Sequence, residues 1–122
     1  MSEEQVIAFI QAHIKSVWAL ELLILLTEDR NRGWQQEELV RVMRSSAGAI
    51  DEAIKNLQAA SIVATDADGR YSFAPTSADL DELATGVRNI YGAKPATVVR
   101  AIMTAPENKL RIFADAFKFR NQ

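Results

Sequence analysis

The sequence predicts a mostly helical α+β domain, and three observations lead to this prediction. Apolar residues recur at intervals of three and four over most of the chain, which is the spacing of amphipathic helices. Asp66-Ala67-Asp68-Gly69 joins two short β-rich runs, 62–65 and 70–74, and Asp-Gly at such a place is a strong hairpin signal. The chain has 122 residues, of which 48% are hydrophobic, so residues 1–122 can form a single domain with one core.

The N-terminal part of the chain is predicted to be helical. Apolar residues keep helical spacing across residues 4–28, either in one long helix or in two helices that break near Ser16. The Ser16 hydroxyl is a suitable cap for the second of these helices. A polar turn that ends in Gly33 terminates the helical pattern.

The most apolar stretch, residues 17–26, is interpreted as a buried helix. It is about half as long as a helix that crosses a bilayer, and it contains Glu21. The chain starts with acidic residues, unlike a signal peptide, and it has no cysteine for disulfide bonds. We therefore expect a cytoplasmic protein without a membrane segment, and we assign Trp18 to its core.

Two short elements are predicted after the polar turn. Trp34 fits a strand of one or two residues, and we interpret its ring as an anchor between the first helix and the hairpin or as a ligand-stacking group. Leu39, Val40 and Met43 mark one face of a short helix, which has two glutamates in its first turn, where the helix dipole favours them.

Another helix is predicted directly after the turn 44–46, and one of the serines in this turn would cap it. Its expected core face carries apolar side chains at helical spacing, namely Ala47, Ile50, Ile54 and Leu57. Its opposite face carries small, polar and charged side chains, namely Ser46, Ala49, Asp51, Glu52, Lys55 and Asn56.

Three further helices are expected after the hairpin. Ser77 caps the first, which ends at Gly92, and Pro95 opens the second, which closes before Pro106. The third is expected at about 107–119. It combines an apolar stripe with several cations, namely Leu110, Phe113, Ala114 and Phe117 with Lys109, Arg111, Lys118 and Arg120. Three interpretations of this helix stay open: it docks a partner or a twin subunit, it lies on a membrane surface, or it packs on its own domain.

The order of the elements predicted between residues 17 and 75 resembles a winged helix-turn-helix. The run EELVRVMRSSAGAIDEAIKNLQAASIVATDADGRYSFAP, residues 37–75, is similar to the second helix, third helix and wing of that superfamily. Regulators of the MarR or PadR type are the nearest broad comparison. The N-terminal helix and the C-terminal helical extension at 77–120 fit regulators that dimerise outside the winged helix.

The resemblance implies a bacterial-type transcriptional regulator that binds double-stranded DNA as a homodimer. The third helix would enter the major groove and the wing would follow the backbone. Arginine and lysine contact guanine or phosphate, asparagine contacts adenine, and serine makes short-range contacts. The candidate DNA-binding residues are therefore Arg41, Arg44, Ser45, Ser46, Lys55, Asn56 and Arg70, with Arg30 and Arg32 as further cations.

The charge of this region favours a second hypothesis. Residues 34–75 carry four basic and six acidic side chains, whereas affinity for duplex DNA rests largely on cations. Asp51 and Glu52 face outward on the third helix, and Asp66 and Asp68 lie at the tip of the wing. The alternative function is a winged-helix protein–protein interaction module without DNA binding, whose acidic surface meets a basic patch on a protein partner.

No catalytic or metal-binding motif is present in the sequence. There is no nucleophile paired with a base, no glycine-rich phosphate loop, and no cysteine. His13 is the only histidine and has no carboxylates spaced around it as metal ligands would be. Asp66 and Asp68 resemble the start of a calcium loop, but Gly69 comes too early and no glutamate completes the loop. We therefore expect no enzyme activity, no cofactor and no metal.

Overall fold

The computed structural model describes residues 2–105, and over these residues it has the predicted α+β, mostly helical architecture. The elements follow in the order α1 (Glu3–His13), α2 (Val17–Glu28), α3 (Gln36–Met43), α4 (Ala47–Ala59), β1 (Val63–Thr65), β2 (Tyr71–Phe73), α5 (Ala78–Ala93) and α6 (Pro95–Met103). The helix expected at 107–119 lies outside the described residues. None of the described helices has the length and apolar character that crossing a membrane requires.

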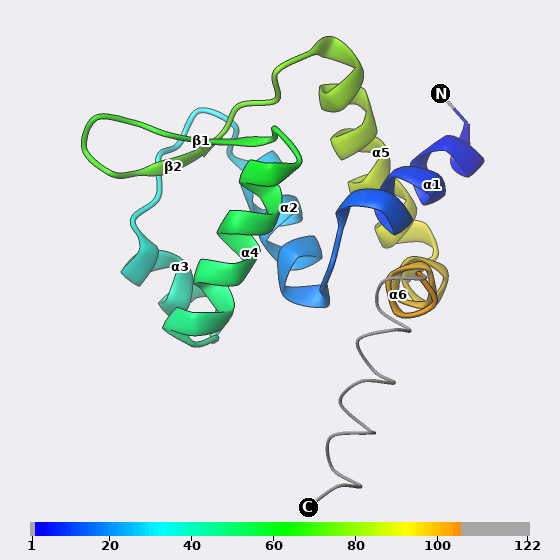
Figure 1. Ribbon diagram of the computed structural model, residues 1–122, viewed down its shortest axis with the longest axis horizontal. Coiled ribbons are helices and arrows are strands. Elements are labelled where there is room, and N and C mark those ends of the chain that lie inside the picture. Colours follow the sequence, from blue (N-terminus) through cyan, green and yellow to red (C-terminus); the bar gives the residue numbers. More distant parts are fainter. Residues whose placement is uncertain (1, 106–122) are drawn as a thin grey trace, which may run out of the picture.

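Helix α2 lies between two groups of elements (Figure 1). It packs against α4 on one side and against α5 on the other. In the first group, α3 packs on α4, and the β1–β2 hairpin contacts α2 and α4. In the second group, α1, α5 and α6 pack on one another. The buried side chains of both groups form one continuous hydrophobic core, so α2 joins the two groups into a single unit.

The N-terminal helical region is broken into two helices, which is one of the two predicted alternatives. At the break, the backbone of Ile14 is extended and its side chain is fully buried. Ser16 is the N-cap of α2, because its hydroxyl accepts a hydrogen bond from the backbone N–H of Ala19 at 3.1 Å. The break lets α1 leave the direction of α2 and pack on α5 and α6.

The hairpin forms where the sequence predicts it, with β1 and β2 antiparallel. Asp66 Oδ1 accepts hydrogen bonds of 2.9 Å from the backbone N–H groups of both Asp68 and Arg70. Gly69 has a φ of 78°, a conformation that glycine adopts without the strain a side chain would cause. The side chain of Asp66 therefore organises the turn.

Trp34 forms a one-residue strand beside the hairpin, as predicted. Its backbone N–H and C=O exchange two hydrogen bonds of 2.8 Å with Tyr71. Its ring is only 4% exposed, and the guanidinium of Arg32 lies over it at 3.6 Å from the ring centroid. Trp34 thus anchors the loop after α2 to the hairpin, and its buried ring is not placed to stack on a ligand.

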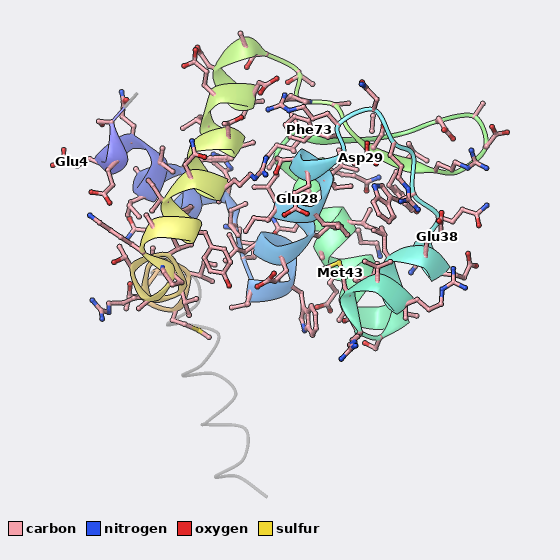
Figure 2. The ribbon with its side chains drawn as sticks, turned by 180° about the vertical axis from the view of Figure 1, so that it is seen from behind. Glu4, Glu28, Asp29, Glu38, Met43 and Phe73 are labelled. Carbon is pink, nitrogen blue, oxygen red and sulfur yellow. The ribbon has the colours of Figure 1, made fainter. Side chains whose placement is uncertain are left out.

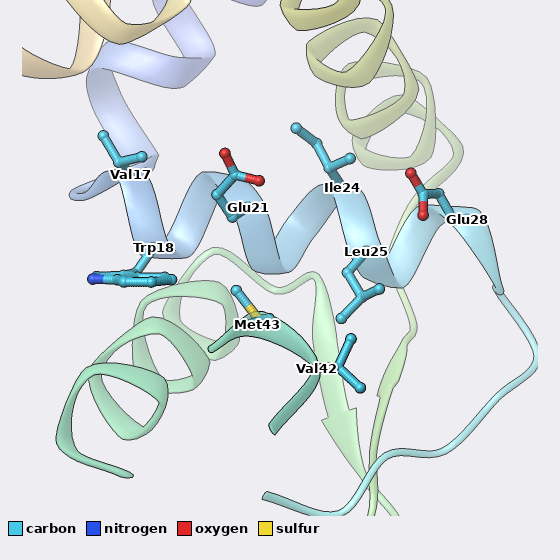
Figure 3. Close-up of a pocket in the computed structure, with 8 residues that line it drawn as sticks. All are labelled: Val17, Trp18, Glu21, Ile24, Leu25, Glu28, Val42 and Met43. Carbon is cyan, nitrogen blue, oxygen red and sulfur yellow. The ribbon is translucent and has the colours of Figure 1, made fainter. Parts of the chain in front are cut away.

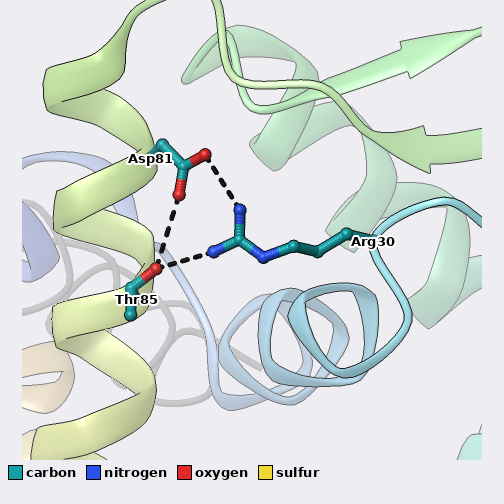
Figure 4. A network of polar contacts seen from close by, with 3 residues as sticks. All are labelled: Arg30, Asp81 and Thr85. Carbon is teal, nitrogen blue, oxygen red and sulfur yellow. Dashed lines mark hydrogen bonds and ion pairs between the residues drawn. The ribbon is translucent and has the colours of Figure 1, made fainter.

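Arg30 connects the loop after α2 to α5 (Figure 4). Its guanidinium donates hydrogen bonds to the carboxylate of Asp81 at 2.9 Å and to the hydroxyl of Thr85 at 2.8 Å. The same group lies 4.8 Å from the centroid of the Phe73 ring. Arg30 therefore links the loop after α2 to α5 and to β2. Its charge is paired with Asp81, so its position does not favour a contact with DNA.

Helices α5 and α6 begin where the sequence predicts. The Ser77 hydroxyl accepts a hydrogen bond from the backbone N–H of Leu80 at 3.1 Å, and Pro95 is the first residue of α6. Gly86 allows α1 to approach α5 closely, because a Cβ at this position would lie 2.8 Å from Cγ2 of Val6.

Two predictions about the core are wrong. The sequence predicts Trp18 in the core, but its side chain is 39% exposed. Helix α2 is apolar on nearly all sides, so its sequence does not show which side faces solvent. The spacing predicts Ala47 on the core face of α4, but it is exposed in the first turn after the cap, and Ala53 is the buried alanine of that helix.

Candidate nucleic-acid interface

The predicted DNA-contacting residues lie around α4 and the hairpin, and a tight turn positions the start of α4. Helix α3 ends at Arg44, whose backbone is left-handed with φ 52° and ψ 48°. The N–H of Ser45 donates to the C=O of Val40 at 3.0 Å. The chain therefore reverses within three residues, and α4 begins directly beside the end of α3.

The two serines of this turn have structural roles. Ser46 Oγ accepts a hydrogen bond from the backbone N–H of Ala49 at 3.2 Å and so caps α4, as predicted for one of the two. Ser45 Oγ is buried and forms no hydrogen bond with any described residue. Contact between this turn and a phosphate would therefore use backbone N–H groups of α4 rather than serine hydroxyls.

Lys55 is on the exposed side of α4, but its charge is paired. Its ammonium donates to the carboxylate of Asp51 at 2.9 Å, one helical turn earlier. This hydrogen bond and the negative charge of Asp51 raise the pKa of Lys55. A phosphate would have to compete with Asp51 for this cation.

Asn56 connects α4 to the link between α1 and α2. Its Oδ1 accepts a hydrogen bond from the backbone N–H of Lys15 at 2.8 Å. Its Nδ2 donates to the carbonyl of His13 at 2.6 Å. Base reading by asparagine uses this same pair of amide groups, so in this conformation Asn56 serves the fold rather than adenine recognition.

Three of the predicted residues present cations to solvent. Arg41 lies in the last turn of α3, Arg44 lies in the turn before α4, and Arg70 lies directly before β2. All three are exposed, and none forms an ion pair with the described residues. Their charges are thus available to phosphate groups.

Arg32 differs from these three arginines. It donates to the carboxylate of Glu38 at 3.0 Å while it covers the ring of Trp34. The carboxylate of Glu38 also accepts the backbone N–H of Gln35 at 3.0 Å. These two hydrogen bonds, with that from the backbone the larger, lower the pKa of Glu38. Arg32 therefore stabilises the start of α3 and is not one of the exposed unpaired cations.

Acidic side chains lie on the same surfaces. Glu52 is exposed on α4, and Asp66 and Asp68 are exposed in the hairpin turn. Asp66 uses one carboxylate oxygen within the turn, whereas Glu52 and Asp68 form no ion pair with the described residues. The candidate interface therefore combines cations at the end of α3 and directly before β2 with carboxylates on α4 and at the hairpin tip.

A second surface feature, which residue spacing alone does not predict, is an apolar groove between α2 and α3 (Figure 3). This α2–α3 groove has a volume of about 620 Å³ and is lined by Val17, Trp18, Glu21, Ile24, Leu25, Glu28, Val42 and Met43. Val42 is 54% exposed, and its place outside the predicted apolar face of α3 was a signal visible in the sequence. Figure 2 shows Glu28 and Met43 on the face that is turned toward the viewer.

Polar contacts connect the α2–α3 groove to α5. The Tyr91 hydroxyl donates a hydrogen bond of 2.8 Å to Glu21 Oε1. This bond, together with partial burial and the negative charge of Glu21, raises the pKa of Tyr91. The contact places the C-terminal part of α5 next to the groove.

Residues 2–105 contain no group of three or more histidine, aspartate or glutamate side chains arranged to hold a metal ion. His13 instead packs edge-on against the ring of Phe9, with ring centroids 5.1 Å apart. Comparison of the chain with protein-family models, with curated proteins and with solved structures gives no match.

Proposed function

We propose that this chain is a winged-helix DNA-binding protein that acts as a dimeric transcriptional regulator. The order of α2, the Trp34 bridge, α3, α4 and the β1–β2 hairpin supports the fold part of the proposal. In this arrangement α4 corresponds to the helix that enters the major groove, and the hairpin corresponds to the wing.

The observation that carries the proposal is the conformation and environment of Arg44. A left-handed backbone costs a non-glycine residue roughly 1 kcal/mol, and glycine would avoid this cost. The side chain of Arg44 forms no ion pair among the described residues that would offset the cost. An exposed cation in a strained position, beside the N-terminus of α4, fits a phosphate contact.

Three available arginines set the expected salt dependence. If Arg41, Arg44 and Arg70 each neutralise one phosphate, the slope of log affinity against log salt is about −2.7 for one protomer. Affinity then falls roughly 40-fold between about 50 and about 200 mM salt. The carboxylates of Glu52 and Asp68 weaken the interaction, so we expect moderate affinity with low sequence discrimination.

The proposal is tested with Arg44→Gly, because this substitution removes the cation and relieves the strain. We expect the variant to be as stable as the parent chain or more stable, while the steepness of its salt slope on duplex DNA decreases by about 0.9 for each protomer. Ser61→Gly is the matched control. Ser61 is the other non-glycine residue of the described chain with positive φ, at 64°, so the substitution relieves similar strain and removes no charge. Equal DNA binding by parent, Arg44→Gly and Ser61→Gly chains would contradict the role of Arg44.

A second candidate function is a protein-interaction module, and the paired state of Lys55 favours it. Since Asp51 neutralises Lys55, the exposed face of α4 presents Glu52 as its unpaired charge, and Asp68 adds another carboxylate at the hairpin. A basic protein surface would complement these groups. Asp51→Lys distinguishes the two functions: it should strengthen DNA binding if α4 meets phosphates, and it should weaken capture of a basic partner if α4 meets protein.

A further inference from the structure

The α2–α3 groove exposes apolar side chains that the described residues leave uncovered. Trp18, Val42 and Met103 are the large hydrophobic side chains most exposed in residues 2–105, and the first two line this groove. Trp18 and Leu25 lie seven residues apart on α2, so the apolar lining extends for about 10 Å along the helix axis. Such a strip has the dimensions of a docking site for one amphipathic helix.

We propose that residues 106–122 of the same chain occupy the α2–α3 groove. Leu110, Phe113, Ala114 and Phe117 have the i, i+3, i+4, i+7 spacing of one helix face. This stripe is also about 10 Å long in a helix, which matches the apolar lining of the groove. Its aromatic side chains would cover Trp18 and Val42.

The charges of the two surfaces are complementary. Glu21 and Glu28 line the groove, and among the described residues neither forms an ion pair. The segment contains four cations and two carboxylates and so has a net positive charge, from Lys109, Arg111, Lys118 and Arg120 against Glu107 and Asp115. The cations beside the apolar stripe would meet the glutamates at the edge of the groove.

The segment follows closely in sequence on a residue that contacts the groove. Tyr91 contacts Glu21 at the groove, and α6 begins four residues later at Pro95. The chain from Tyr91 to Ala105 spans at most roughly 35 Å, since α6 is a helix of about 14 Å. A further five residues, which span up to about 17 Å when extended, lead from Ala105 to Leu110, where the apolar stripe begins. Attachment to the same chain gives the segment an effective concentration near the millimolar range. Even with weak affinity, the groove is therefore occupied more often by the segment of its own chain than by the segment of a second copy in dilute solution.

The fluorescence of Trp18 reports directly on occupancy of the groove. The sequence contains two tryptophans, so Trp34→Phe leaves Trp18 as the single reporter in the full chain. This substitution keeps an aromatic ring under Arg32, and it removes no hydrogen bond of the described residues, because Trp34 Nε1 has no partner among them. Acrylamide quenching of Trp18 then measures its exposure to solvent.

Phe117→Asp is the test variant and Phe119→Asp is its matched control. Both introduce one carboxylate into the same segment, but at 100° per residue Phe119 lies far from the apolar stripe of Phe117 on a helix. We expect strong protection of Trp18 in the reporter chain and in the Phe119→Asp chain. We expect about a threefold increase in quenching with Phe117→Asp, because Trp18 is 39% exposed.

A second variant changes the groove instead of the segment. Val42→Lys adds a cation at an exposed position of the groove, so it should release the basic segment and raise the quenching of Trp18. Because Val42 is exposed, the substitution leaves the packing of the hydrophobic core unchanged. Far-UV circular dichroism and melting temperature establish that each variant is folded. Protection that is unchanged over about a hundredfold dilution supports docking within the chain.

Two results would overturn the proposal. Equal quenching in the reporter, Phe117→Asp and Val42→Lys chains would show that the segment does not cover Trp18 and that the groove is open to another occupant. Protection that disappears on dilution, together with a doubled mass by light scattering at high concentration, would identify the segment of a second copy as the occupant.

Discussion

Replacement of Asn56 by alanine should destabilise the fold, because the side chain joins α4 to the link between α1 and α2. The variant loses the hydrogen bonds to the N–H of Lys15 and to the carbonyl of His13, at 2.8 and 2.6 Å. At about 1 kcal/mol for each bond, the free energy of unfolding falls by about 2 kcal/mol. The melting temperature then decreases by roughly 8 °C, at about 4 °C per kcal/mol for a domain of this size.

Thermal and urea unfolding followed by circular dichroism measure this change. Asn56→Asp tests the direction of the two bonds, since a carboxylate still accepts from Lys15 but turns an acceptor oxygen toward the carbonyl of His13, so we expect a loss at least as large as that of alanine. Lys55→Ala is the exposed control one position earlier. A melting temperature of Asn56→Ala within about 2 °C of the parent, together with lost binding to DNA, would refute the structural role and return Asn56 to base recognition.

Three further substitutions test separate parts of the fold. Ser46→Ala removes the cap of α4 and should lower the free energy of unfolding by about 1 kcal/mol in urea titration. Gly86→Ala places a Cβ 2.8 Å from Val6 and should cost about 1 kcal/mol after the gain in helix propensity, and a double-mutant cycle with Val6→Ala should show favourable coupling. Tyr91→Phe tests pH dependence: because the folded pKa of Tyr91 is raised, its contribution is complete below about pH 10 and is lost above it. Between about pH 8 and about pH 11, the melting temperature of the parent should therefore fall more steeply than that of Tyr91→Phe. Parallel melting-temperature curves for the two chains would contradict the hydrogen bond to Glu21.

The features that the sequence predicted well are specified by neighbouring residues. Ser16 caps α2 through a contact three residues away, and Ser77 does the same for α5. The turn before Arg70 is organised by Asp66 and Gly69 within the same short segment. Such signals are contained in a few consecutive residues, so they can be identified without knowledge of the tertiary structure.

The features that the sequence did not predict depend on contacts between distant residues. Asn56 and His13 are 43 residues apart, and no local pattern distinguishes an asparagine that bonds a distant backbone from one that faces DNA. Trp18 lies on a helix that is apolar on nearly all sides, so only the packing of α4 and α5 decides which side stays exposed. The α2–α3 groove follows from that packing and was therefore not predictable from spacing alone.

The structure divides the residues of the candidate interface into two sets. Of the proposed contacts, Arg41, Arg44 and Arg70 are exposed and form no ion pair among residues 2–105. Lys55 and Asn56 have partners within the fold, because ion pairs and amide hydrogen bonds depend on which neighbours the tertiary structure brings near. The proposed DNA contact therefore rests on the three arginines and on the backbone at the start of α4.

Fluorescence anisotropy of a labelled, mixed-sequence genomic duplex pool, titrated with the full chain at low and near-physiological salt, tests the proposed function most directly. The three available arginines predict micromolar binding that weakens with a log–log salt slope of about −2.7 for each protomer. Selection of the bound fragments would then identify the preferred site. No binding even at low salt would contradict the DNA-binding proposal and leave the protein-interaction module as the function to be tested.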